Sequence, residues 1–149
     1  MIKIQKYSQS TPLTSERQKQ IVAFLYKSLE QYGDPEEDIN KAVNYAMNTL
    51  YANKDTSGTV LSATLEDKIV GAVVLNETGM GGYIPDNILV YIATDANHRG
   101  QGIGKKLMQE ALQAVDGDVA LHVEPDNPAK KLYESLGFTN KYLEMRFKK

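Results

Sequence analysis

The chain has 149 residues, of which 42% are hydrophobic and 24% charged, a balance typical of a single globular domain spanning residues 1–149. The net charge of −2 argues against a nucleic-acid-binding protein, and the lack of cysteine excludes disulfides and thiolate nucleophiles. Two histidines are too few to predict a zinc site, and no metal is expected. No signal peptide or membrane span of roughly 20 apolar residues is evident, so we expect a cytoplasmic protein without membrane partners.

The first part of the chain predicts one strand and two helices. Residues 2–7 alternate apolar and polar side chains, as in a strand. Apolar residues then recur at helical spacing over 15–32, with Ser15 as the expected N-cap and Gly33 as the stop. A second helix is expected to begin directly afterwards, with Asp34 as its N-cap.

The middle of the chain predicts strands. Two runs rich in β-branched residues within 58–77 flank the polar turn 66–68, which indicates an antiparallel hairpin. A glycine-rich loop follows over 78–87. Residues 88–93 (ILVYIA) are apolar at every position, which predicts a central strand covered on both faces.

The last third alternates helices and strands. An apolar stripe over 103–115 predicts a helix, 118–124 a strand, 127–137 a helix and 143–147 a closing strand. The resulting order, β, α, α, β, β, β, α, β, α, β, indicates a mixed sheet with helices on both faces.

The stretch HRGQGIGKK, residues 98–106, predicts a phosphate site. Gly100, Gly102 and Gly104 leave the unpaired N–H groups of a helix N-terminus accessible to an anion. The spacing fits neither a P-loop nor a dinucleotide-binding fingerprint. A tight turn without a ligand is the alternative, although one glycine would serve for that.

Two segments resemble motifs of one family. ILVYIATDANHRGQGIGKKLMQEAL (88–112) resembles the main CoA-binding motif of the GNAT superfamily of acyl-CoA-dependent N-acyltransferases, and VALHVEPDNPAKKLYESLGF (119–138) resembles its next strand–helix motif. The resemblance implies an α/β fold of mixed α+β type, with a central, mostly antiparallel mixed sheet of about six to seven strands. It also implies acetyl-CoA as co-substrate.

The resemblance also implies which residues bind acetyl-CoA. The pyrophosphate would lie on the amides of the glycine segment, the pantetheine arm would pair with the strand before it, and Asn127 would contact that arm, although it could equally be a plain helix cap. The implied set is Ile92, Ala93, Thr94, Arg99, Gly100, Gln101, Gly102, Ile103, Gly104, Lys105, Asn127 and Lys130. Thr94 and Ala96 stand where the family often has an apolar residue and a proline.

Catalytic roles are less constrained. The resemblance implies that Tyr133 acts as general acid toward the leaving thiolate, with a place in the core as the alternative. Glu124 is the candidate base, acting directly or through water. His122, Asp95 and Tyr91 stay open for the same role. His98 is expected to be a surface residue.

We therefore expect transfer of an acetyl group from acetyl-CoA to a primary amine of a small molecule or peptide, by direct attack in a ternary complex. The family's acceptor enters near the first two helices, where the acids of residues 30–38 could attract a cationic amine or simply favour a helix start. A non-catalytic acyl-CoA sensor is the alternative function, and a homodimer is left open. A partner-binding module would leave the glycines unexplained.

Overall fold

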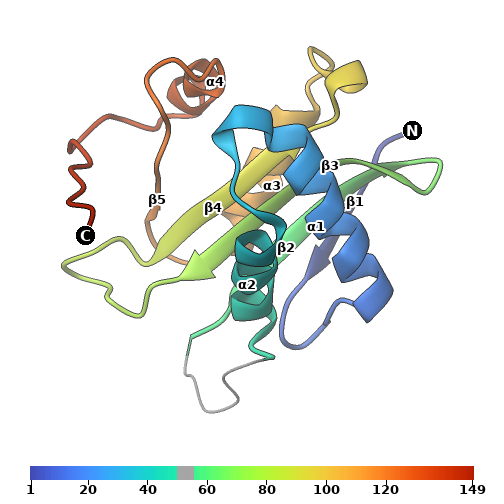
Figure 1. The fold of residues 1–149 in the computed structure, drawn as a ribbon, viewed down its shortest axis with the longest axis horizontal. Coiled ribbons are helices and arrows are strands. Elements are labelled where there is room, and N and C mark those ends of the chain that lie inside the picture. Colours follow the sequence, from blue (N-terminus) through green and yellow to red (C-terminus); the bar gives the residue numbers. More distant parts are fainter. Residues whose placement is uncertain (50–55) are drawn as a thin grey trace.

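The computed structural model describes residues 1–49 and 56–149, drawn in Figure 1. Within them lie the strands β1 (Lys3–Tyr7), β2 (Gly58–Leu65), β3 (Lys68–Glu77), β4 (Asn87–Thr94) and β5 (Val119–Leu121), and the helices α1 (Ser15–Leu29), α2 (Glu36–Met47), α3 (Ile103–Ala114) and α4 (Ala129–Ser135). The strands form one sheet in the order β1–β2–β3–β4–β5. Only β4 and β5 pair in parallel. The mixed, mostly antiparallel sheet expected from the sequence is confirmed.

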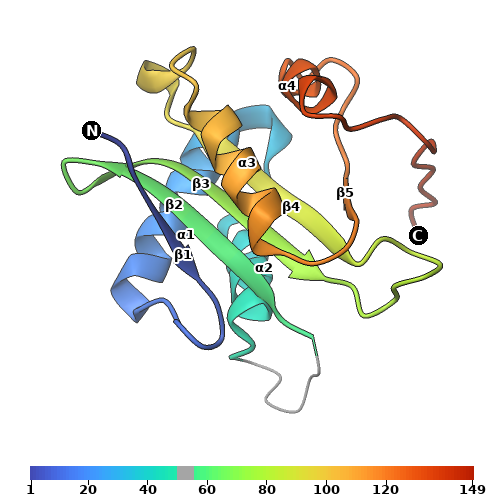
Figure 2. The same ribbon diagram turned by 180° about the vertical axis from the view of Figure 1, so that it is seen from behind.

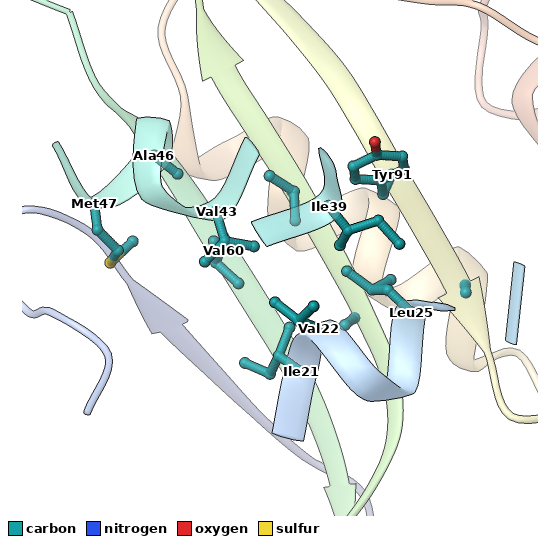
Figure 3. Close-up of a cluster of buried hydrophobic side chains, with 12 residues drawn as sticks. Ile21, Val22, Leu25, Ile39, Val43, Ala46, Met47, Val60 and Tyr91 are labelled. Carbon is teal, nitrogen blue, oxygen red and sulfur yellow. The ribbon is translucent and has the colours of Figure 1, made fainter. Parts of the chain in front are cut away.

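Helices cover both faces of this sheet, as opposite views show (Figures 1 and 2). The first cluster of buried side chains lies beneath α1 and α2 (Figure 3) and contains Ile21, Val22, Leu25, Ile39, Val43, Ala46, Met47, Val60, Ala72, Val74, Tyr91 and Ala93. The second cluster lies beneath α3 and contains Leu61, Ala63, Val70, Val73, Leu75, Leu89, Ile103, Leu107, Met108, Ala111 and Tyr133. Helix α4 therefore belongs to the α3 side of the sheet.

The start of α1 differs from the sequence prediction by one residue. Ser15 was the expected N-cap, but the hydroxyl Oγ1 of Thr14 accepts the hydrogen bond from Arg17 N, at 3.1 Å. A hydroxyl three residues before a free helix N–H has the reach that capping requires. A 3₁₀ turn, Glu30–Tyr32, extends the chain beyond α1.

The predicted N-cap of α2 is also wrong. The helix begins at Glu36, its N-cap residue is Pro35, and no side chain makes a capping bond there. The carboxylate of Asp34 instead accepts a hydrogen bond from the hydroxyl of Tyr91 on β4. Asp34 therefore pairs with a residue 57 positions away in the sequence and not with an N–H group in the first turn of α2.

The predicted hairpin is confirmed. Strands β2 and β3 pair up to Leu65 and Lys68, and the two residues between them, Glu66 and Asp67, have φ of 53° and 65°. Two successive positive φ angles are those of a type I′ turn, whose twist matches that of the flanking strands.

Strand β4 is covered on both faces, as predicted. Val90 packs against the first cluster and Ile92 against the second. Along β3, the partner of Tyr91 is Val74, and the next residue of β3 pairs with Leu89, so Val90 is an extra residue that forms a β-bulge.

Pairing between β4 and β5 stops at the same point. The pairs run from Asn87↔Val119 to Leu89↔Leu121, and β5 ends there while β4 continues to Thr94. A bulge bends its strand and disturbs the ladder, which accounts for the divergence. Residues 90–94 of β4 are called the open edge below.

The sequence overestimated the number of strands. The described residues contain five, not six to seven, and 143–147 forms none. The apolar side chains of that segment, Leu143, Met145 and Phe147, are 82%, 90% and 85% exposed. Alternating side chains give a segment two faces, but a strand also needs a neighbouring ladder, which this segment does not reach.

Candidate functional site

The glycine loop, residues 99–105, comprises the last part of the connection from β4 and the first residues of α3. Gly100 and Gly102 have φ of 79° and 80°, a region that side chains disfavour, and a Cβ on either would meet nothing within 4 Å. The first hydrogen bond of α3 runs from Lys106 N to Gly102 O, at 3.0 Å. The N–H groups before Lys106 therefore lack intrahelical acceptors, as an anion site requires.

Gly104 lies where three elements meet. A Cβ on Gly104 would lie 3.4 Å from Thr94 Oγ1 of β4 and 3.4 Å from Leu132 Cδ2 of α4. Ile103 is a core residue, 4% exposed, so only its backbone is available to a ligand. Gln101 and Lys105 are exposed.

The side chain of Arg99 contacts α1 rather than the loop. Its Nη2 donates to Ser28 O at 3.2 Å and lies 3.7 Å from the carboxylate of Glu30. Ser28 belongs to the last turn of α1, where carbonyls lack intrahelical donors. Arg99 thus connects the entry of the glycine loop to the end of α1.

The open edge presents backbone groups of two residues. Asp95 N donates to Val70 O, at 2.8 Å, and bonding direction alternates along an antiparallel strand. The N–H and C=O groups of Ala93 therefore face β3, whereas those of Ile92 and Thr94 face the side that β5 has left. Of the three residues predicted for the pantetheine arm, Ile92 and Thr94 have backbone groups that point away from β3 and are not paired with β5.

Tyr133 of α4 is 7% exposed and belongs to the second cluster. Its ring centroid lies 6.0 Å from that of Phe138, with 60° between the ring planes. Burial raises the pKa of the Tyr133 phenol to about 12, so its hydroxyl stays protonated at neutral pH. Both alternatives from the sequence fit its position: the ring is a core side chain, and the hydroxyl is an available proton donor.

Two other predicted residues of this region have partners on α4. Asn127 Oδ1 accepts a hydrogen bond from Ala129 N at 2.9 Å, as a helix cap does. Lys130 Nζ lies 3.2 Å from Glu134 Oε2 in an exposed pair. The amide nitrogen of Asn127 and the remaining donors of Lys130 are still available to a ligand.

The candidate bases are distributed over separate places. Glu124 lies three residues beyond β5, is exposed, and makes no side-chain hydrogen bond with any residue of the described ranges. Asp95 Oδ2 lies 2.6 Å from His98 Nδ1, and this bond lowers the pKa of the Asp95 carboxyl. His98, expected at the surface, is only 22% exposed in its side chain.

Tyr91 carries the other long-range pair. Its hydroxyl donates to Asp34 Oδ2 at 2.5 Å, and burial, followed by this bond, raises the pKa of the Tyr91 phenol well above its usual range. Sequence spacing contains no signal for a contact between residues 57 positions apart.

The α1–α2 junction, residues 30–35, borders an open pocket of about 490 Å³. The pocket is lined by Tyr26, Lys27, Glu30, Gly33, Asp34 and Pro35. Two of the acids noted in the sequence, Glu30 and Asp34, line this pocket, and both have partners. Glu30 lies beside Arg99, and Asp34 accepts a hydrogen bond from Tyr91.

Residues 1–49 and 56–149 contain neither a group of metal-ligating side chains nor a helix suited to cross a membrane. No group of three or more His, Asp or Glu side chains is arranged to hold a metal ion in this part of the chain. None of its helices combines the length and apolarity needed to cross a membrane.

Comparison with known proteins identifies the family. The model of the acetyltransferase (GNAT) domain matches residues 56–140, more than half of the chain. The chain belongs to the GNAT acetyltransferase family. The match includes β4, the glycine loop, α3 and α4, and therefore all the residues predicted to bind acetyl-CoA.

Solved structures share the GNAT fold over almost the whole chain. A ribosomal-protein-alanine N-acetyltransferase from Brucella melitensis biovar Abortus 2308 is 14% identical, with a TM-score of 0.64 over 99% of both chains. An aminoglycoside N-acetyltransferase in complex with CoA is 14% identical, with a TM-score of 0.70 over 100% of this chain and 95% of that one. An aminoglycoside acetyltransferase from an uncultured soil metagenomic sample, in complex with sisomicin, is 21% identical, with a TM-score of 0.65 over 99% and 95%.

Proposed function

We propose that this GNAT protein transfers an acetyl group from acetyl-CoA to a primary amine of a small molecule or peptide, by direct attack in a ternary complex within one catalytic domain. The observation that carries the proposal is the position of Gly104, in reach of both Thr94 on the open edge and Leu132 on α4. It brings the glycine loop, the free backbone of β4 and the helix of Tyr133 together at one place.

The chain's own residues fit acetyl-CoA. The free amides before Lys106 suit the pyrophosphate, and a side chain on Gly100 or Gly102 would project into the open space beside them. Ile92 and Thr94 offer backbone groups for the amides of the pantetheine arm. Lys105, Asn127 and Lys130 add donors around this path, and Ala93, Gln101 and Ile103 complete its backbone.

Acetyl-CoA supplies an acetyl group activated as a thioester. Tyr133 would donate its hydroxyl proton in a hydrogen bond to the sulfur. With a phenol pKa of about 12 against about 8.5 for a thiol, complete proton transfer is uphill by roughly 5 kcal/mol. Stabilisation of the leaving sulfur by the hydrogen bond is therefore the role we propose for Tyr133.

The proton of the amine needs a separate acceptor. Glu124 is the proposed base, and its exposed position favours action through a water molecule over direct contact. Asp95 is a weaker candidate, because its carboxylate already accepts a hydrogen bond from His98 that lowers its pKa.

The acceptor is proposed to approach through the pocket at the α1–α2 junction. Aminoglycosides and the alanine of a ribosomal protein are named for two proteins of the same fold, and both present amines. An amine panel for this chain therefore contains an aminoglycoside, a peptide with N-terminal alanine, and spermidine as a small polyamine.

The test measures free thiol released from acetyl-CoA with each amine of the panel, beside calorimetric binding of CoA. Amine-dependent thiol release supports the proposal. Binding of CoA without thiol release across a broad amine set would instead establish a non-catalytic acyl-CoA sensor. Absence of CoA binding would contradict both functions.

A further inference from the structure

The α1–α2 junction is held in place by three long-range contacts. Tyr91 of β4 donates to Asp34, and Arg99, just before the glycine loop, donates to Ser28 O beside the junction. Tyr32 donates from the junction to Asp126 O in the loop after β5, at 3.3 Å. The three partners lie on β4 itself, on the segment that follows β4, and in the loop that follows its parallel neighbour β5.

The backbone of the junction is unusual at its first residue. Glu30 has φ of 54° and ψ of −126°, a conformation that residues with a side chain rarely adopt. Such a conformation persists only where surrounding contacts stabilise it. The three contacts above therefore help to hold the backbone of Glu30 in this conformation.

Of the three donor residues, Tyr91 is the most buried. The ring of Tyr91 is 8% exposed and packed in the first cluster, and its hydroxyl oxygen points out of that cluster (Figure 3). The bulge at Val90 precedes it directly, so Tyr91 lies where β4 leaves β5. The acceptor is a carboxylate, and the 2.5 Å distance is that of a charge-assisted bond.

Because Asp34 accepts the hydrogen bond from Tyr91, it does not act as the N-cap of α2. Its sequence position suits an N-cap, a role whose loss typically costs about 1 kcal/mol, yet α2 begins without a side-chain cap. A local preference overridden by a distant contact is characteristic of functional positions.

We propose that the Tyr91–Asp34 hydrogen bond positions the α1–α2 junction against the open edge of β4, and thereby determines how well the amine acceptor is held while leaving acetyl-CoA binding unchanged. The inference rests on the proposed acetyl transfer. Tyr91 and Asp34 are positioning residues in it, and the contact between them matters more than the charge of Asp34.

Three variants separate the hydrogen bond from the charge. Tyr91→Phe removes only the donor, Asp34→Ala removes the acceptor, and Asp34→Asn removes the charge but keeps a side-chain oxygen that can accept from Tyr91. Tyr7→Phe is the matched control, because Tyr7 also packs on the first cluster but donates within its own strand, to Gln5.

Each variant is assayed with the best amine of the panel and with CoA alone. We expect Tyr91→Phe and Asp34→Ala each to lower kcat/KM for the amine about tenfold, mainly through a higher acceptor KM, as loss of one bond to a charged group predicts. The double variant should be no worse than either single one. Tyr7→Phe should stay within about twofold of the parent, and the Kd of CoA should be unchanged throughout. Asp34→Asn keeps an acceptor for the Tyr91 hydroxyl but loses the charge, so it should lose less activity than Asp34→Ala.

Three results would overturn the inference. In the first, Asp34→Asn loses as much activity as Asp34→Ala while Tyr91→Phe is unaffected, which would assign the effect to the charge. In the second, CoA affinity falls in parallel with amine kinetics. In the third, hydrogen exchange of the CoA-bound protein at residues 30–35 is no faster in Tyr91→Phe than in the parent. The exchange measurement does not depend on catalysis, so it tests the role of the Tyr91–Asp34 hydrogen bond even in a protein without acetyltransferase activity. A parent protein that binds CoA but acetylates no amine would contradict the proposed function and leave this test intact.

Discussion

At the scale of single residues, Tyr133 combines two properties that rarely coincide. Its ring is part of the second cluster, and its hydroxyl has no hydrogen-bond partner among the residues that the structure describes. The hydroxyl oxygen is not among the buried polar atoms that lack a partner in the described residues, so it lies at the edge of the cluster, where it is free to donate to a ligand.

Tyr133→Phe tests that role directly. The substitution keeps the ring contact with Phe138 and removes only the donor. We expect kcat and kcat/KM for a good amine to fall together, on the order of 10²-fold, because the hydrogen bond to the sulfur strengthens only as the transition state forms. The Kd of CoA should hardly change. An unaffected kcat, with the chemical step shown to be rate-limiting, would make Tyr133 a core residue alone.

At the scale of elements, two positions of the glycine loop require glycine for different reasons. Gly102 needs its left-handed backbone, whereas Gly104 lies inside α3 in an ordinary helical position and is distinguished by the space around it. Substitution of each by alanine should therefore have opposite effects.

Gly104→Ala should keep or raise folding stability, by on the order of 0.5 kcal/mol, because alanine favours the helix and its Cβ makes only ordinary contacts at 3.4 Å. Its methyl group fills the space between β4 and α4, so CoA affinity should fall on the order of tenfold. Gly102→Ala, the comparison, should lose about 1–2 kcal/mol of stability because of its positive φ. Urea unfolding and calorimetric titration with CoA measure both effects. A Gly104→Ala protein with unchanged CoA affinity would place the ligand elsewhere.

Local signals predicted the elements that lie beside the site. The apolar stripe of α3, the hairpin turn and the glycine loop depend on neighbouring residues, and each formed where expected. The segment 143–147 had an equally regular pattern, but a strand also requires a partner, which the pattern does not contain. The Tyr91–Asp34 and Arg99–Ser28 contacts depend on the fold itself and have no local signal.

At the scale of the whole molecule, buried phenols couple folding to alkaline pH. Burial raises the pKa of Tyr133 from about 10 in an unfolded chain to about 12 in the fold. A raised pKa contributes stability that is fully present below about pH 10 and lost as the pH rises through about 12.

Tyr133→Phe should therefore flatten the alkaline part of the stability profile. Between pH 8 and pH 11 the parent should lose on the order of 1 kcal/mol more unfolding free energy than the variant, measured by urea unfolding. Tyr142→Phe, whose ring is 79% exposed, is the control and should follow the parent. Parallel profiles for all three proteins would mean that the Tyr133 phenol is not buried in solution.

The bulge in β4 has a consequence for sequence length. Leu89 faces the second cluster and Tyr91 the first, so without Val90 these two would already alternate correctly and continue an unbroken ladder with β3. The extra residue changes no side-chain assignment; it lengthens one strand relative to its neighbour by a single position. The divergence of β4 from β5, where we propose that acetyl-CoA binds, is thus specified by the number of residues in β4. A sequence comparison that left out this extra residue would miss the feature that forms the opening.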